Sequence, residues 1–204
     1  MEKINMRTNE GTLKTYVELL EDNKTNDNRH DMHGLYLAHI IIANRFKNVI
    51  ELGVRDGKST KALLYGVKHT GGHLTSVDVN ETPYTPEDHL AENWTFHRQD
   101  ALDFLNKYDK KIDFIFVDDW HAEDHVFEEL SLIHKLVDPA SLITLHDAMW
   151  GSNHPYYNEK ESKSGEFAGK SVYGALQRFV KKYPEYEFST IPINQGLTIL
   201  RKTK

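Results

Sequence analysis

The stretch Val49-Ile-Glu-Leu-Gly-Val-Arg-Asp-Gly-Lys-Ser-Thr60 predicts a buried strand that runs through a tight glycine turn into a helix. Its first four residues are mostly β-branched or apolar, as expected for a strand. Gly53 and Gly57 carry no Cβ, so the backbone can turn sharply there and approach a ligand closely. Ser59 and Thr60 suit the start of a helix. The stretch therefore predicts a loop against which a nucleotide-like ligand binds.

Strand and helix patterns alternate along the chain and predict an α/β fold. The expected strands are Asn48–Leu52, Leu74–Val79, Thr95–Arg98, Asp113–Val117, Ser141–Leu145, Glu185–Ile191 and Gly196–Arg201. The expected helices are Thr12–Leu20, His33–Phe46, Lys58–Lys68, Ala101–Tyr108, Ala122–Leu136 and Val172–Lys182. Repeated β-α units predict a Rossmann-like, doubly wound, mostly parallel seven-stranded sheet with a C-terminal antiparallel strand and helices on both faces. We expect one compact unit, with residues 1–46 as an N-terminal helical cap and residues 47–204 as the ligand-binding domain.

Composition excludes several classes of protein. The net charge of −6 over 204 residues gives no electrostatic footprint for DNA or RNA. The absence of cysteine excludes disulfides, thiolate metal sites and cysteine nucleophiles, and fits a cytoplasmic protein. The longest apolar run, near Leu35–Ala43, is too short to span a bilayer and contains His39. We therefore expect a cytoplasmic protein that binds neither nucleic acid nor a membrane.

Acidic residues and histidines follow most of the predicted strands, at the edge where ligands of such sheets bind. These positions are Gly53–Gly57, Asp78, Gln99-Asp100, Asp118–His121 and His146-Asp147. The carboxylate of Asp78 suits bidentate hydrogen bonding to the hydroxyls of a ribose. Adjacent parallel strands lie about 4.8 Å apart, so the last two positions are expected to converge on one cation. Oxygen ligands suit Mg²⁺ or Ca²⁺, and one added histidine admits Mn²⁺, Fe²⁺ or Zn²⁺.

The glycine turn also resembles a nucleoside triphosphate-binding loop, but its spacing argues against one. Gly53-x-x-x-Gly57-Lys-Ser-Thr60 has three residues between its glycines, and a Walker A loop needs four to wrap a phosphate. Gly165-x-x-x-Gly169-Lys-Ser171 has the same shortfall and follows no predicted strand. The sequence therefore disfavours an NTPase.

The pattern Glu51-x-Gly53-x-x-x-Gly57 resembles motif I of class I methyltransferases that depend on S-adenosylmethionine (SAM). More narrowly, the chain resembles the metal-dependent O-methyltransferases related to catechol O-methyltransferase, and bacterial methyltransferase family 24. Ile50-Glu51-Leu52-Gly53, Asp118-Asp119-Trp120-His121 and His146-Asp147 carry this resemblance, which runs from about His33 to Leu145.

The resemblance implies SAM and a divalent cation as cofactors, with Mg²⁺ first and Ca²⁺ or Mn²⁺ as alternatives. The implied cofactor-binding residues are Glu51, Gly53, Gly57, Ser59, Asp78, Asp100, Ala101 and Asp119, with Asp100-Ala101 facing the adenine. The implied cation ligands are Asp118, His146 and Asp147. His121 stands in place of the family's lysine base, so it is expected to take a proton from the hydroxyl of a small-molecule substrate. A homodimer is one expected assembly.

Other functions stay open at this point. One is a non-catalytic protein that binds SAM or another metabolite on the same fold. Another is an enzyme that uses the fold for a metal-assisted reaction other than methyl transfer. Nucleic-acid methylation is disfavoured, because Asp118–His121 replaces the Asn/Asp-Pro-Pro-aromatic motif of amino-methylating enzymes and cytosine C5 chemistry needs a cysteine. The long loop Asp147–Gly169 is expected to contact the acceptor through its aromatic residues. These residues are Trp150, His154, Tyr156 and Tyr157.

Overall fold

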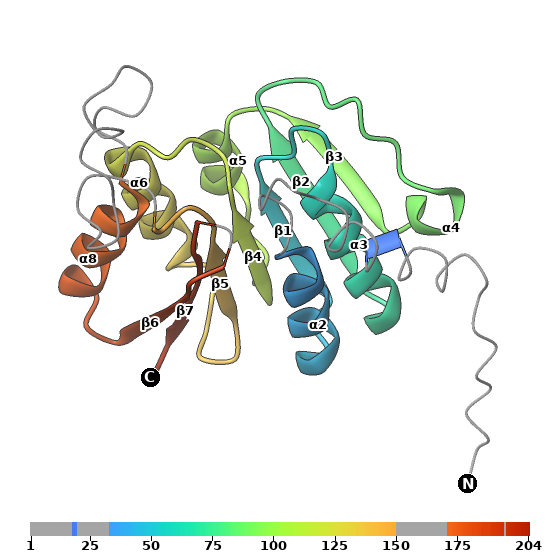
Figure 1. Cartoon of the computed structure of the whole chain (residues 1–204). Helices are drawn as coiled ribbons and strands as arrows, with labels where there is room; N and C mark the ends of the chain where they lie inside the picture. Colours follow the sequence, from blue (N-terminus) through green and yellow to red (C-terminus); the bar gives the residue numbers. More distant parts are fainter. Residues whose placement is uncertain (1–17, 20–32, 150–170, 194) are drawn as a thin grey trace, which may run out of the picture.

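The strands of the chain form a single seven-stranded sheet with the order β3-β2-β1-β4-β5-β7-β6 (Figure 1). The structure, a computed structural model, describes residues 18–19, 33–149, 171–193 and 195–204. The strands are β1 (Asn48–Leu52), β2 (His73–Asp78), β3 (Trp94–Arg98), β4 (Phe114–Val117), β5 (Leu142–Leu145), β6 (Tyr186–Ile191) and β7 (Leu197–Lys202). β7 runs antiparallel to both of its neighbours, and β1 to β5 are parallel. The predicted fold class is confirmed.

Helices cover both faces of the sheet (Figure 1). They are α2 (Gly34–Asn44), α3 (Lys58–Thr70), α4 (Asp88–Ala91), α5 (Ala101–Lys107), α6 (Glu123–Ile133) and α8 (Val172–Lys182). Successive side chains of a strand point to opposite faces, and β4 shows this directly. Phe114 and Phe116 pack with α2 and α3 on one face, and Ile115 and Val117 pack with α5, α6 and α8 on the other. Because β4 is buried on both faces, it lies at the centre of the core.

Most predicted boundaries agree with the structure to within two residues, and two features differ. Helix α6 ends at Ile133 rather than Leu136, because the chain turns so that the Leu136 carbonyl accepts a hydrogen bond from Ile112 N at 2.8 Å. Helix α4 is a single turn and too short to show helical periodicity in the sequence. The predicted helix Thr12–Leu20 lies outside the described residues except for Glu18 and Leu19, which are helical.

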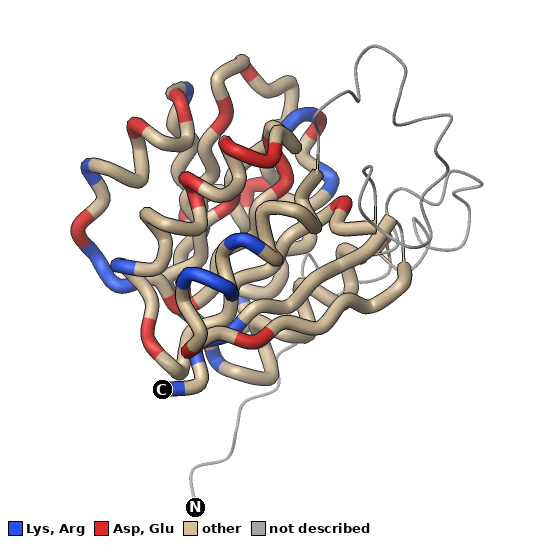
Figure 2. Tube along the Cα trace, turned by 90° about the vertical axis from the view of Figure 1, so that its left-hand side faces the viewer, with Lys and Arg blue, Asp and Glu red and all other residues tan. Residues whose placement is uncertain are grey.

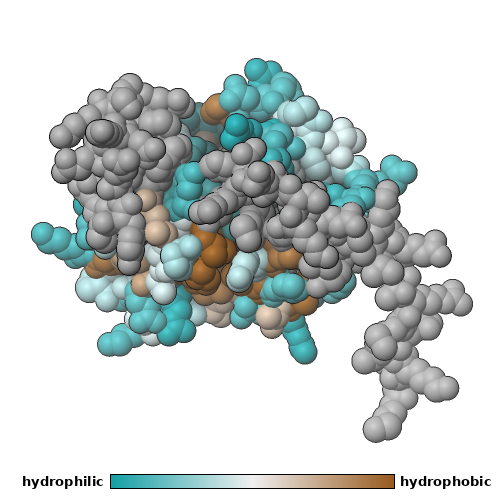
Figure 3. All heavy atoms as spheres, viewed as in Figure 1, coloured by the Kyte–Doolittle hydropathy of each residue, from teal (hydrophilic) through white to brown (hydrophobic). Residues whose placement is uncertain are grey.

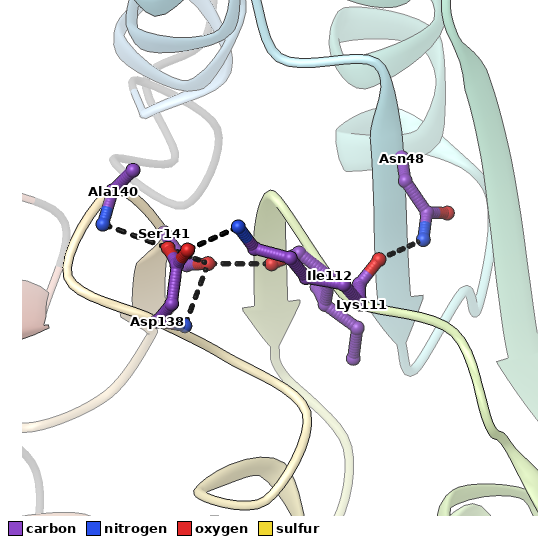
Figure 4. Close-up of polar contacts among 6 residues, drawn as sticks. All are labelled: Asn48, Lys111, Ile112, Asp138, Ala140 and Ser141. Carbon is purple, nitrogen blue, oxygen red and sulfur yellow. Dashed lines mark hydrogen bonds and ion pairs between the residues drawn. The ribbon is translucent and has the colours of Figure 1, made fainter.

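Side chains lock the starts of the central strands together at one edge of the sheet (Figure 4). Ser141 Oγ donates to the carbonyl of Ile112 at 2.6 Å and accepts from Asp138 N at 3.1 Å. Lys111 pairs with the Asp138 carboxylate, and the Asn48 side chain donates to the Lys111 carbonyl. These contacts fix β1, β4 and β5 relative to one another, and therefore also fix the opposite, carboxyl ends of these strands.

The described surface carries mixed charge and scattered apolar residues. Figure 2 shows acidic and basic residues interspersed along the described trace. Figure 3 shows hydrophobic residues across the lower middle of one face, and Tyr36 of α2 is 48% exposed. None of the helices in the described part of the chain combines the length and the apolar character needed to cross a membrane.

Candidate active site

A cleft of 1160 Å³ lies at the carboxyl ends of the parallel strands. Its size suits a nucleotide-like cofactor together with a small second ligand. Most of the residues predicted for the site line it, and they are Gly53, Ser59, Asp78, Asp100, Ala101, Asp118, Asp119, His121, His146 and Asp147. Two predicted cofactor residues, Glu51 and Gly57, lie behind the wall of this cleft. The fold therefore brings together side chains that are far apart in the sequence.

The glycines of the first turn are required by backbone conformation and by close packing. Gly53 has φ +88°, and a Cβ there would lie 2.3 Å from the carbonyl oxygen of Asp118. Gly57 has φ +80°, and its Cβ would lie 2.2 Å from the ring of Tyr84. Larger residues would therefore strain the backbone and its neighbours at both positions. Gly57 shapes the turn by packing on Tyr84, whereas Gly53 faces the cleft.

The Glu51 carboxylate lies inside the protein rather than in the cleft. It accepts hydrogen bonds from Ser59 Oγ at 2.6 Å, Thr60 Oγ1 at 2.8 Å and Ser76 Oγ at 2.6 Å. Burial raises the pKa of Glu51 to about 7, and the three hydroxyl donors oppose this increase. In this structure Glu51 joins β1 to β2 and to the start of α3. A direct contact of its side chain with the cofactor, as the sequence led us to expect, would need a different arrangement.

Asp78 at the end of β2 is fixed in the cleft wall by backbone donors. Its Oδ2 accepts from Val54 N at 2.9 Å and from Arg55 N at 3.1 Å, and its Oδ1 accepts from Asn80 N at 2.8 Å. A carboxylate oxygen has more than one acceptor position, so both oxygens retain capacity for a ligand hydroxyl. Asp100 also lines the cleft, and its side chain caps helix α5 by accepting from the Asp103 amide at 3.1 Å.

Two carboxylates and two imidazoles converge where β4 and β5 end. His121 Nε2 lies 2.9 Å from Asp147 Oδ2 and 3.5 Å from Asp118 Oδ1. His146 Nδ1 lies 3.2 Å from Asp118 Oδ1 and 3.1 Å from Asp147 Oδ1. One donor atom each from Asp118, His121 and Asp147 lie within 4.8 Å of one another, a grouping that can hold a metal ion. The sequence had placed His146 in that set, and the structure brings both histidines to the two carboxylates.

The charges of this cluster support one another. Burial opposes ionisation of Asp118, but its ion pair with His146 and its hydrogen bonds to both histidines outweigh burial, so its pKa falls below the usual range. Burial also disfavours a charged His121, yet hydrogen bonds to Asp118 and Asp147 raise its pKa to about 9. The same two carboxylates raise the pKa of His146 against the effect of burial.

Asp147 reaches the cluster through an uncommon backbone conformation. Its φ of +57° lies in the left-handed region, which costs a non-glycine residue about 1 kcal/mol or more. Such conformations persist where the surrounding structure holds them, often at functional sites. The Asp147 Oδ1 atom is buried and pairs with His146 Nδ1 at 3.1 Å, but it has no well-aligned hydrogen bond from the described residues. An oxygen in this situation suits a cation ligand.

Sequence reasoning missed further residues near the cleft. The buried ring of His33 lies 4.5 Å from the ring of His146, measured between centroids, and no local pattern marks it. His125 also lines the cleft, and Glu129 lies beside it on α6. Both had been assigned no role, because helical spacing alone does not separate a buried polar side chain from a solvated one.

Comparisons with known proteins show which proteins the chain resembles. Residues 50–148 match a family described as a methyltransferase domain. A flavonoid 3',5'-methyltransferase from Vitis vinifera is 25% identical over 181 residues, covering 83% of this chain and 76% of the relative. The methyltransferase domain and this relative support a SAM-dependent O-methyltransferase of the class I fold.

Solved structures support the fold of this methyltransferase. An O-methyltransferase from Bacillus cereus in complex with SAH superposes with a TM-score of 0.60 at 18% identity, covering 98% of this chain and 93% of that one. TomG, an O-methyltransferase from Streptomyces achromogenes in complex with SAM, gives a TM-score of 0.61 at 17% identity, with the same coverage of both chains. At such low identity these likenesses establish the shared fold, and the site residues are argued from the geometry above.

Proposed function

We propose that this methyltransferase transfers the methyl group of SAM to a hydroxyl oxygen of a small molecule, with the help of a divalent cation. One observation carries the proposal. The carboxylates of Asp118 and Asp147, paired with two histidines, lie in the same cleft as Asp78, so a cation and a nucleotide-like cofactor would lie side by side. A methyl donor and a hydroxyl held in this way are oriented for direct displacement at the methyl carbon.

The cleft wall fits SAM. The fixed Asp78 carboxylate would accept hydrogen bonds from the two ribose hydroxyls. Asp100 and Ala101, at the start of α5, line the adjoining part of the cleft and would contact the adenine, and Asp119, after β4, lines the same cleft. Gly53 keeps the backbone of the first turn low enough for the cofactor to approach.

The cluster at β4 and β5 fits a divalent cation. Its two carboxylates are joined by histidine nitrogens, and the buried Asp147 Oδ1 pairs with His146 Nδ1 without a well-aligned hydrogen bond from the described residues. Oxygen ligands suit Mg²⁺ or Ca²⁺, and an imidazole in the set also admits Mn²⁺. A bound cation would lower the pKa of the acceptor hydroxyl and hold it in place.

We assign different roles to the two histidines. His146 bridges both carboxylates and its side chain is 8% exposed, so we assign it as a ligand with Asp118 and Asp147. The His121 side chain is 23% exposed, and it is oriented by Asp147, so we assign it as the acceptor of the substrate proton. Hydrogen bonds to the carboxylates of Asp118 and Asp147 raise the pKa of His121. A cation bound to these carboxylates would remove this effect.

The acceptor class follows from chemistry and charge. The relative from Vitis vinifera is named for a flavonoid, and the net charge of −6 does not favour nucleic acid as the acceptor. A small molecule with a hydroxyl, such as a phenol, is therefore the proposed substrate. The homodimer, the cytoplasmic location and the division at residues 46 and 47 stay predictions.

The proposal is tested with radiolabelled SAM and a panel of catechols, flavonoids and sugars. We expect label to appear on a hydroxyl oxygen with Mg²⁺, Mn²⁺ or Ca²⁺ present and to fall to background with a chelator. The His121→Gln variant should lower kcat roughly 10²- to 10⁴-fold while SAM binding persists. His73→Gln, at the opposite edge of the sheet, is the matched control. Transfer that is indifferent to the chelator would contradict the cation, and SAM binding without transfer would favour a binding protein.

A further inference from the structure

We propose a second cation site in this protein, formed by Asp119, His125 and Glu129 where β4 connects to α6. His125 and Glu129 are four residues apart on α6 and therefore project from the same face of the helix. His125 Nε2 lies 3.3 Å from Asp119 Oδ2 and 3.5 Å from Glu129 Oε1. One donor atom from each residue lies within 4.8 Å of the other two.

Glu129 supplies an independent reason to expect a ligand here. Its side chain is fully buried, and neither carboxylate oxygen accepts a hydrogen bond from any residue that the structure describes. The same holds for Asp119 Oδ1. Buried polar groups in proteins are nearly always hydrogen-bonded, and an uncompensated buried carboxylate is strongly unfavourable. Three buried oxygens that all lack hydrogen bonds, gathered around one imidazole, indicate a place for a cation.

The charges of the cluster can be balanced by a divalent ion. Without a cation, burial raises the pKa of Glu129 to about 8, so that carboxyl holds a proton. A divalent cation bound to both carboxylates and to a neutral imidazole would displace the protons of the cluster and neutralise both negative charges.

The separations of the donor atoms suit a transition metal. With metal–ligand bonds of about 2.0–2.2 Å, two ligands of a tetrahedral ion lie about 3.3–3.6 Å apart. The separations of 3.3 Å and 3.5 Å in the cluster lie within this range. One imidazole with two carboxylates is a ligand set of the kind that Zn²⁺ accepts. We therefore take Zn²⁺ as the expected occupant.

The second site would stabilise the wall of the active-site cleft. Asp119 and His125 line that cleft, and the Trp120 ring lies 5.2 Å from the His125 ring, measured between centroids. An ion at this position would tie the segment after β4 to α6. It uses no residue of the cluster made by Asp118, His121, His146 and Asp147, so the two sites can be removed separately.

The test is the number of Zn²⁺ ions bound by the full-length chain after it has been stripped with a chelator and titrated against a chromophoric indicator. We expect two ions for the wild type, one for Glu129→Gln and one for Asp147→Asn. Glu128→Gln, an exposed neighbour on the same helix that loses the same charge, should still bind two. Zn²⁺ should raise the melting temperature of Asp147→Asn but not that of the double variant with Glu129→Gln.

The possible outcomes distinguish failure of the second site from failure of the proposed function. Equal Zn²⁺ numbers for Glu129→Gln and the wild type would overturn the second site, as would a complete loss of binding in Asp147→Asn. Equal numbers for Asp147→Asn and the wild type would overturn the cation at β4 and β5 and leave the second site standing. If Glu129→Gln fails to fold by circular dichroism, His125→Gln replaces it, with the same expected loss of one ion.

Discussion

His121 Nε2 lies 2.9 Å from Asp147 Oδ2, although the two residues follow different strands. β4 positions the histidine, and the left-handed conformation of Asp147 directs its carboxylate back from the end of β5. The contact therefore depends on the parallel pairing of β4 with β5, which aligns Val117 with Leu145. A one-residue shift of this register would turn the side chains of the shifted strand to the opposite face of the sheet and separate the residues that follow β4 and β5.

His146 is expected to keep the cluster stable when no cation is bound. It lies between the carboxylates of Asp118 and Asp147, which would repel each other without it. His146→Gln should lower the free energy of unfolding in chelator by about 3 kcal/mol, because a buried ion pair loses one partner. Mn²⁺ should restore part of this loss. Urea denaturation with and without Mn²⁺ measures both effects, and an unchanged midpoint in chelator would refute the role of His146.

Asp78 is expected to dominate the affinity for SAM. Asp78→Asn removes the charge that strengthens its hydrogen bonds to the ribose, and charged hydrogen bonds contribute about 1.5–3 kcal/mol each. The Kd for SAM should rise at least about tenfold, with cation binding unchanged. Calorimetry measures both, and Asp109→Asn, an exposed acid outside the cleft, is the control. Equal affinity in the Asp78 variant and the control would remove Asp78 from the cofactor site.

Two glycines provide a matched comparison for the first turn. Gly57 and Gly71 both have positive φ, but a Cβ at Gly57 meets the Tyr84 ring whereas a Cβ at Gly71 has nothing within 4 Å. Gly71→Ala should cost about 1 kcal/mol of stability from the backbone alone. Gly57→Ala should cost roughly 1–3 kcal/mol more, because the ring must move. Urea unfolding compares the two, and similar losses would show that Tyr84 yields easily.

Glu51 is expected to make stability depend on pH. Its pKa near 7 in the folded protein exceeds its usual value of 4.5, so the folded state binds the proton more tightly. Its contribution is therefore complete below about pH 4.5 and is lost as the pH rises through 7, by about 3 kcal/mol in all. Glu51→Gln lacks this titration. The difference in unfolding free energy between the two proteins should fall from pH 5 to pH 8, and a constant difference would contradict the raised pKa.

The sequence was sufficient to predict the fold because its signals are local. The strand Asn48–Leu52 and the helix Val172–Lys182 were predicted with the bounds that the structure shows, since each has a clear apolar pattern and a sharp end. Strand ends in a parallel sheet meet at one edge, which explains why the sequence also predicted that Asp118 and Asp147 lie close together. His33 and Glu129 were missed, because their importance comes from tertiary contacts that no local spacing records.

The closest test of the account is whether a cation lies beside the methyl group of SAM. Mn²⁺ broadens proton resonances of nearby ligands, so the methyl signal of excess SAM reports on the cation in the cleft. We predict strong broadening for Glu129→Gln, which lacks the second cation site, and loss of most of it when Asp147→Asn is added to that variant. Equal broadening in the two variants would contradict the cation site between β4 and β5.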